Sequence, residues 1–277
     1  MKNPEAEFTA DSRGHVKLTV EMVYGESTVT SAFASSPMKL LTPVSRGKSA
    51  WAMTSSFGGG LVAGDQTRLD VAVGPGACCF VGTQSSTKVY RNPARLPCSH
   101  TTAATLGSGS LLVFAPDPVQ SFADSEYVQR QEFQLASDAG LVLLDWCSSG
   151  RAARGERWEF ARFESRNDVY VDGERAVVDS VRLAADSARE RMGRFNCLAT
   201  LVLIGPKLKS AAEALCKEIA SRPVVKRAAL ICSASAIQAG TILRVAGEEV
   251  EAVRRELRGQ LAFLEELLGD SPWARKW

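Results

Sequence analysis

The chain has 277 residues, of which 45% are hydrophobic and 23% charged, and its 33 lysines and arginines against 31 acidic residues leave a net charge of +2. This is the composition of an ordinary globular protein, and the near-neutral balance argues against a nucleic-acid partner. No apolar run reaches the 18 residues of a membrane helix, and the first 15 residues are charged where a secretory signal would be apolar. We therefore expect a cytoplasmic protein without membrane contact.

The cysteines and histidines predict no tight metal site. The seven cysteines are an odd number and stand mostly inside apolar runs, which indicates buried free thiols in a reducing compartment. Cys78 and Cys79 would point to opposite faces of a strand, so the two thiols should not chelate one metal ion together. The only histidines, His15 and His100, lie near no other soft ligand in sequence.

Up to about residue 195, the chain reads as short strands separated by glycine-containing turns. In residues 15–25, the side chains of Val16, Leu18 and Val20 alternate with polar ones. An alternating strand, a small-residue turn and an apolar strand then recur around residues 67–84, 101–118 and 130–147, with turn glycines at 76, 109 and 140. This repetition predicts a mostly β fold, an irregular stacked multi-layer β-sheet body. Unrelated hairpins in a large sandwich are the alternative.

From about residue 196 the pattern changes to a βαββα-like portion with two helices. The expected elements are a buried strand at 198–205, a helix at 206–222, strands near 228–233 and 241–246, and a helix at 248–269. The last helix carries an apolar stripe from Val250 to Leu268 and ends at Gly269. No low-complexity linker separates the two portions, so residues 1–277 are expected to form a single domain.

The stretch SFGGGLVAGDQTRLD (56–70) contains a glycine loop formed by Gly58, Gly59, Gly60 and Gly64. Gly59 and Gly64 have the spacing of a phosphate-binding loop, but Asp65 and Gln66 follow where lysine and serine or threonine are needed. Because a carboxylate at that place repels phosphate, this function is excluded. A tight turn in which Asp65 hydrogen-bonds its own backbone remains an alternative to a functional role.

Three further polar stretches are candidates for function. In TQSSTKVYRNP (83–93), Ser86, Lys88 and Tyr90 would share one face of a strand, which suits either an interface or a Ser/Lys hydrolase. In APDPVQSF (115–122), two prolines flank Asp117 and hold it rigidly.

The third stretch, DWCSSGRAARGERWEF (145–160), combines Glu156 with several arginines that could pair with it. A hydrolase using Ser86 and Lys88, or Glu156, is therefore the alternative function. The interface candidates are Lys88, Tyr90, Arg91, Arg151 and Arg154.

Taken together and in this order, these stretches resemble the urease accessory protein D family (UreD, also called UreH). The resemblance rests on SPMKLLTP, GGGLVAGDQTRLDVAVGPGA, GTQSSTKVYRNP, PDPVQSF, QRQEF and LLDWCSSGRAARGE, and it covers roughly residues 36–183. TQSSTKVYR, PDPV and DWCSSGR look closer to the plant and fungal branch than to the short bacterial forms. Where many members have Gly-Gly-Asp, this chain has Ala63-Gly64-Asp65.

The resemblance implies a non-enzymatic role. Members of this family help insert nickel into apo-urease and connect that enzyme to accessory protein F, which docks the GTPase accessory protein G. It also implies a mostly β fold, membership of a hetero-oligomer, and nickel in transit through an internal water-filled passage, with no tightly bound cofactor.

The matched motifs make Asp65 and Glu156 candidates for weak, transient nickel contacts, with Asp117 and Asp179 as weaker ones. Such a passage suits sparse carboxylates, because a cage of histidines and cysteines would trap the ion.

Overall fold

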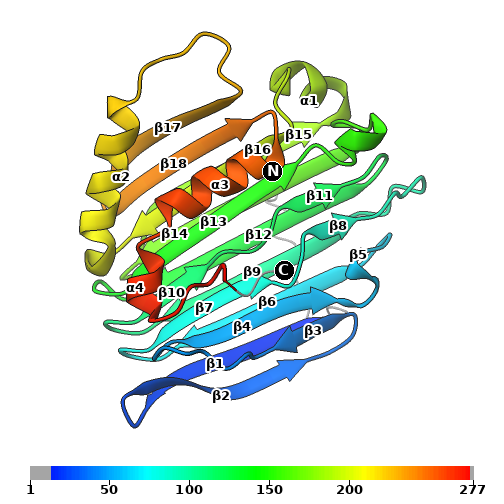
Figure 1. The fold of residues 1–277 in the computed structure, drawn as a ribbon. Coiled ribbons are helices and arrows are strands. Elements are labelled where there is room, and N and C mark those ends of the chain that lie inside the picture. Colours follow the sequence, from blue (N-terminus) through cyan, green and yellow to red (C-terminus); the bar gives the residue numbers. More distant parts are fainter. Residues whose placement is uncertain (1–13, 275–277) are drawn as a thin grey trace, which may run out of the picture.

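The computed structural model describes residues 14–274, which form two facing β-sheets with helices on one side (Figure 1). The first sheet contains, in spatial order, β15 (Glu174–Ala184), β14 (Arg162–Val171), β12 (Glu126–Leu135), β9 (Cys98–Leu106), β6 (Gln66–Val73), β1 (His15–Val23) and β2 (Glu26–Ala34). The path of the second sheet is β17 (Leu230–Ile237), β18 (Gly240–Gly247), β16 (Cys197–Ile204), β13 (Gly140–Ser148), β10 (Leu111–Phe114), β7 (Cys78–Thr83), β4 (Ala50–Ser56) and β3 (Met38–Leu41).

The middle of each sheet is a parallel stack, as the repeated strand–turn–strand pattern predicted. β6, β9, β12 and β14 pair in parallel in the first sheet, and β4, β7, β10 and β13 do so in the second. The chain alternates between the sheets and climbs one layer at each circuit, as in a solenoid. Three short strands, β5 (Gly60–Leu61), β8 (Thr87–Val89) and β11 (Val119–Ser121), form a ladder at one end of the stack.

The register corrects the layer spacing of 33 and 31 residues that the turn glycines at 76, 109 and 140 imply. Cys78 pairs with Leu111, and Leu111 pairs with Gly140, so the successive layers are offset by 33 and 29 residues. Gly140 is therefore the first residue of a strand and does not correspond to Gly109. The residue of the third turn that corresponds to Gly109 is Asp138, whose carboxylate accepts a hydrogen bond from the Gly109 N–H and so links the two turns.

The helices cover the outer face of the second sheet, where Figure 1 shows them in front of the strands. They are α2 (Lys209–Ser221), α3 (Val250–Gln260) and α4 (Leu264–Leu268), and the short η3 (Pro206–Leu208) precedes α2. One buried apolar cluster lies between the two sheets and a second lies between the second sheet and these helices. Cys79 belongs to the first cluster and Cys78 packs against the second, which confirms that they face opposite sides.

Two helix predictions need correction. The single helix expected at 248–269 is broken at residues 261–263, and the second piece, α4, turns so that the Leu268 carbonyl accepts a hydrogen bond from Ser49. The apolar stripe did not reveal the break because Leu261, Leu264 and Leu268 are all buried. Helix α1 (Ala185–Met192) was not expected, since only Ala188 of it is buried and no stripe marks it.

Two further short 3₁₀ turns, η1 (Phe57–Gly59) and η2 (Ala152–Arg154), lie in loops that carry candidate residues. Among residues 14–274, no helix is long and apolar enough to cross a bilayer.

Candidate functional site

Polar side chains form two adjacent rows across the inner face of the first sheet. Since side chains alternate along a strand, inward residues two apart in sequence lie in adjacent rows, and the parallel register extends each row from strand to strand. One row reads Thr67, His100, Gln129, Ser165 and Val181; the other reads Leu69, Thr102, Gln131, Asn167 and Asp179. Polar groups thus follow the axis of the stack through what would otherwise be an apolar core.

The second sheet places one carboxylate opposite these rows. Asp145 of β13 is buried, and its oxygens accept hydrogen bonds from Gln129 Nε2 at 3.0 Å, Ser165 Oγ at 2.5 Å and Asn167 Nδ2 at 2.9 Å. Burial raises the pKa of Asp145, and the nearby charge of Asp179 raises it further, while the three donors act in the opposite direction. Asp145 thus joins the second sheet to three polar side chains of the first.

His100 is the titratable side chain of the first row. Its Nδ1 lies 2.8 Å from Thr67 Oγ1 and its Nε2 lies 3.2 Å from Thr102 Oγ1. Burial lowers the pKa of His100 to about 4. The ring is therefore neutral at physiological pH, and it presents a polar but uncharged surface.

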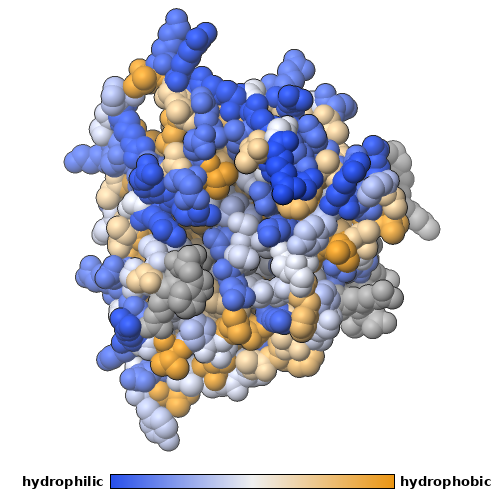
Figure 2. All heavy atoms as spheres, turned by 45° about the vertical axis from the view of Figure 1, so that its right-hand side comes forward, coloured by the Kyte–Doolittle hydropathy of each residue, from blue (hydrophilic) through white to orange (hydrophobic). Residues whose placement is uncertain are grey.

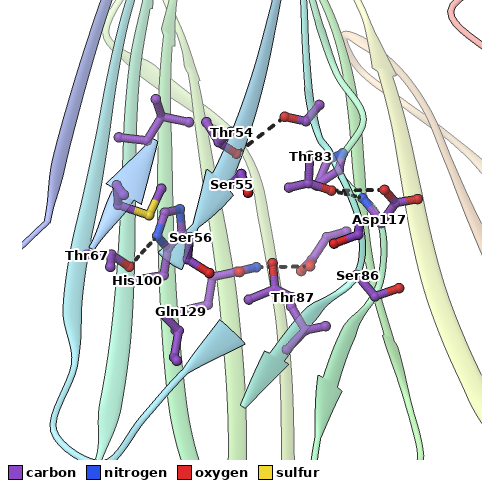
Figure 3. Close-up of a pocket in the computed structure, with 18 of the residues that line it drawn as sticks. Thr54, Ser55, Ser56, Thr67, Thr83, Ser86, Thr87, His100, Asp117 and Gln129 are labelled. Carbon is purple, nitrogen blue, oxygen red and sulfur yellow. Dashed lines mark hydrogen bonds between the residues drawn. The ribbon is translucent and has the colours of Figure 1, made fainter. Parts of the chain in front are cut away.

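A cavity of about 70 Å³ lies between the sheets at the end where β5, β8 and β11 lie. Figure 3 shows Thr67 and His100 on one side of it and Thr83 with Asp117 on the other. The exposed residues Gly59 and Ser85 also line the cavity, so it opens to solvent at this end. Because its lining is rich in hydroxyl and amide groups, the cavity is suited to hold water.

Two carboxylates each line both this cavity and one of two smaller ones. Asp145 lines both the main cavity and one of about 10 Å³ bounded by Ser165 and Thr200, deeper in the stack. Asp117 lines the main cavity and another of about 20 Å³, which is bounded by Arg254 of α3. Each of the smaller cavities has room for about one water molecule.

The second polar row ends at Asp179 on β15, the edge strand of the first sheet. Arg244 of β18 donates from Nη2 to Asp179 Oδ1 over 2.7 Å. The Asp179 side chain is 5% exposed, whereas that of Arg244 is 52% exposed. The other carboxylate oxygen of Asp179, Oδ2, is buried and has no hydrogen-bond partner among the described residues.

The structure places Asp65 in the turn before β6 and not on the cavity. Its Oδ2 accepts a hydrogen bond from the Val62 N–H at 2.8 Å, which is the arrangement of a residue that closes its own turn. Gly58, Gly59 and Gly64 have positive φ. Gly60 is extended, and a Cβ there would lie 2.5 Å from the Lys88 carbonyl oxygen, so β5 and β8 can approach only because residue 60 is glycine.

Glu156 is also engaged away from the cavity. Its carboxylate is buried and accepts hydrogen bonds from the Ala123 N–H and from the Arg151 guanidinium. Arg151 in turn lies over the Phe122 ring, 4.6 Å from its centroid. Asp117 does line the cavity, and it accepts a hydrogen bond from Thr83 Oγ1 at 3.1 Å.

The interface candidates lie together at the open end of the cavity. Lys88, Arg91 and Arg154 are exposed, while the Tyr90 hydroxyl donates to the Gly58 carbonyl oxygen. Ser86 lines the cavity. Figure 2, in which this end comes forward, shows strongly hydrophilic side chains beside hydrophobic ones.

Within residues 14–274, no group of three or more histidines, cysteines, aspartates or glutamates is placed to hold a metal ion. The cysteines that the patterns predicted as free thiols are free in the structure. Burial raises the pKa of Cys78 to about 11 and that of Cys79 further still, so neither is a thiolate at neutral pH.

Sequence reasoning missed Gln129, Asn167, Asp145 and Arg244. A signal was available for the first, because in EYVQRQEF the glutamines occupy the inward positions between Tyr127 and Phe133. A polar residue at a core position of a strand needs a partner, which points to an internal polar network. The partners themselves could not be identified without the register.

Comparisons with known proteins place the chain in a family. The model of the UreD urease accessory protein family matches residues 12–277, which extends the resemblance to the C-terminal portion. A urease accessory protein UreD from Sorangium cellulosum is 49% identical over 97% of this chain and 86% of its own length. Another from Anaeromyxobacter is 40% identical over 95% of this chain and 89% of its own length.

The same comparisons correct the branch inferred from the motifs. The urease accessory protein D of Arabidopsis thaliana is 34% identical over 93% of this chain and 99% of its own length, less than either bacterial relative. The motif versions therefore do not indicate a plant or fungal type. The match over residues 12–277, with a solenoid body that carries α2 to α4 on one face, shows that this chain belongs to the UreD family of urease accessory proteins, non-catalytic factors in urease assembly.

Proposed function

We propose that this protein is the scaffold and nickel-delivery component of a cytoplasmic urease maturation complex. In this proposal it binds apo-urease and accessory protein F, which brings the GTPase accessory protein G, and nickel crosses it as cargo. The hydrolase hypothesis with Ser86 and Lys88, or Glu156, was wrong, because the family consists of non-catalytic assembly factors. Glu156 instead holds its own loop against Ala123 and Arg151.

The observation that carries the proposal is the polar axis inside the stack. Asp117, Asp145 and Asp179 occupy successive positions from the open cavity to the edge of the sheets, with amides and hydroxyls between them. Carboxylates, amides and water are weak ligands for nickel compared with imidazole and thiolate. A cation can therefore be held briefly at each carboxylate and released to the next.

The geometry shifts the proposed nickel contacts away from two of the residues chosen from motifs. Asp65 and Glu156 are engaged with backbone and arginine groups in loops outside the cavity. We therefore assign the passage to Asp117, Asp145 and Asp179, and we keep a contribution of Asp65 as a separate prediction.

The open end of the cavity is the proposed docking face. Lys88, Arg91 and Arg154 are exposed there, beside the exposed Phe57 ring. A partner with an acidic surface and an apolar centre would match this face in charge and hydrophobicity. Docking there would also place the mouth of the cavity against the partner.

The test is co-expression of the chain with a urease operon that lacks its own D component. Wild-type chain should restore nickel-containing urease, measured as nickel per enzyme by mass spectrometry. Asp145→Asn should lower that nickel content while the complex with urease and proteins F and G still assembles. The matched control is Asp186→Asn, which removes the same charge from the exposed start of α1. Equal nickel loading by wild type and Asp145→Asn at limiting nickel would refute the passage.

A further inference from the structure

The polar axis ends at an ion pair between Arg244 and Asp179, which differ in solvent exposure. Arg244 is aligned with Thr200 across β18 and β16, and Thr200 is aligned with Asp145 across β16 and β13, so all three belong to one inner row of the second sheet. Arg244 leaves this row to reach Asp179 on the opposite sheet. Its side chain is half exposed, whereas Asp179 is buried.

The carboxylate of Asp179 has one oxygen that could accept a further hydrogen bond or bind a cation. One of its oxygens accepts the bond from Arg244, and the other is buried without a hydrogen-bond partner among residues 14–274. Leaving a buried carboxylate oxygen unpaired is unfavourable, and such atoms are rare in folded proteins. Asn167, which is aligned with Asp179 across β14 and β15, donates a hydrogen bond to Asp145, so a single residue separates the two carboxylates in the network.

We propose that Arg244 is a displaceable latch that determines which cations pass Asp179. The guanidinium neutralises Asp179 while the passage is empty, and a divalent cation arriving from Asp145 takes its place as the arginine moves into solvent. This inference rests on the proposed nickel passage. No covalent step is involved: one cation replaces another at the same carboxylate, whose second oxygen then gains a partner.

The chemistry of arginine suits this role. Its guanidinium stays charged at any physiological pH, so it leaves the carboxylate only when another cation competes for it. A monovalent metal ion brings the same charge to the carboxylate as the guanidinium but donates no hydrogen bonds, whereas a divalent ion brings twice the charge. Because the Arg244 side chain is half exposed, water can solvate it after release, which lowers the free energy needed to separate it from Asp179.

The test measures cation binding by the full chain, purified with accessory protein F, independently of urease activity. Calorimetry with nickel alone should give Arg244→Gln a nickel affinity about five- to tenfold higher than wild type, since its competitor is removed. Arg244→Met, which keeps much of the aliphatic stem, should behave in the same way and serves if Arg244→Gln folds poorly. Arg244→Lys should remain close to wild type. In Arg244→Gln, sodium chloride should compete with nickel more strongly than in wild type.

Two controls make the result specific. Asp179→Asn combined with Arg244→Gln should lose the gain in affinity. Arg182→Gln removes an arginine from the outer face of β15, where it pairs with Glu164 at 2.9 Å, and should leave nickel affinity unchanged. Unchanged affinity in Arg244→Gln and Arg244→Met, an equal gain in Arg182→Gln, or a gain that survives Asp179→Asn would each overturn the latch.

The proposal of the Arg244 latch and the proposal of the nickel passage can be refuted separately. If Asp145→Asn lowers nickel in urease but the Arg244 variants bind nickel like wild type, the passage stands and the latch is refuted. If Asp145→Asn has no effect on urease loading, the passage is refuted, and a gain in affinity in the Arg244 variants then supports only a binding site at Asp179.

Discussion

Acidification should destabilise this protein through His100. The ring is held between Thr67 and Thr102 in the interior, where burial lowers its pKa to about 4, while in the unfolded chain its pKa is about 6.5. The folded state therefore favours the neutral ring. The stability that depends on this neutral form is fully present above about pH 6.5, and it is lost as the pH falls toward about 4.

The magnitude follows from the two pKa values. At pH 5 the unfolded chain is almost fully protonated at His100 and the folded chain is almost fully neutral there, so linkage lowers the free energy of unfolding by about 2 kcal/mol relative to pH 7. For a protein of this size, that corresponds to a fall in melting temperature of roughly 4–8 °C.

The assay is thermal or urea unfolding of the full chain, with accessory protein F where needed for solubility, at several pH values between 5 and 8. The matched variant is His100→Gln, whose amide can still hydrogen-bond to the threonines but does not titrate. The variant should lose about 2 kcal/mol less than wild type between pH 7 and pH 5. Parallel pH dependences of wild type and variant would refute the reasoning, because other groups would then account for the whole effect.

Three further predictions concern the glycine loop and the thiols. Asp65→Asn should change the free energy of unfolding by less than about 1 kcal/mol, since asparagine can still close the turn. If Asp65 also borders the ion path, urease matured with this variant at limiting nickel will contain less nickel. Full nickel loading would show that Asp65 is a turn residue only. Gly60→Val should destabilise the chain by more than about 2 kcal/mol or abolish complex assembly, because its Cβ would lie 2.5 Å from the carbonyl oxygen of residue 88. The control is Gly58→Ala, which has open space around its Cβ and should lower the free energy of unfolding in urea by about 1 kcal/mol. Cys79→Ala should leave the nickel affinity measured by calorimetry within about twofold of wild type, because the thiol is buried and protonated; a large loss of affinity would show that the sulfur is a ligand.

Much of the fold was readable from the sequence because strand alternation and turn composition are local properties. The strand at 15–23, the strand–turn–strand pattern repeated from layer to layer, and the helix over 209–221 followed from periods of two and 3.6 residues. The family followed from the order of motifs around the glycine loop and the LLDW segment. The break between α3 and α4 did not follow, since an apolar stripe continues through a turn when the leucines on both sides are buried.

Only the tertiary structure decided the polar axis. Asp145 accepts hydrogen bonds from Ser165 and Asn167, which are 20 and 22 residues away in sequence, and Arg244 reaches Asp179 across 65 residues. These pairings depend on the register between layers, which the lengths of the connecting turns and the packing between the two sheets determine together. A local sequence window contains neither quantity. The motifs therefore ranked Asp65 and Glu156, which lie in loops, above Asp117 and Asp179. They did not point to Asp145, which the strand register brings together with Ser165 and Asn167 in the interior.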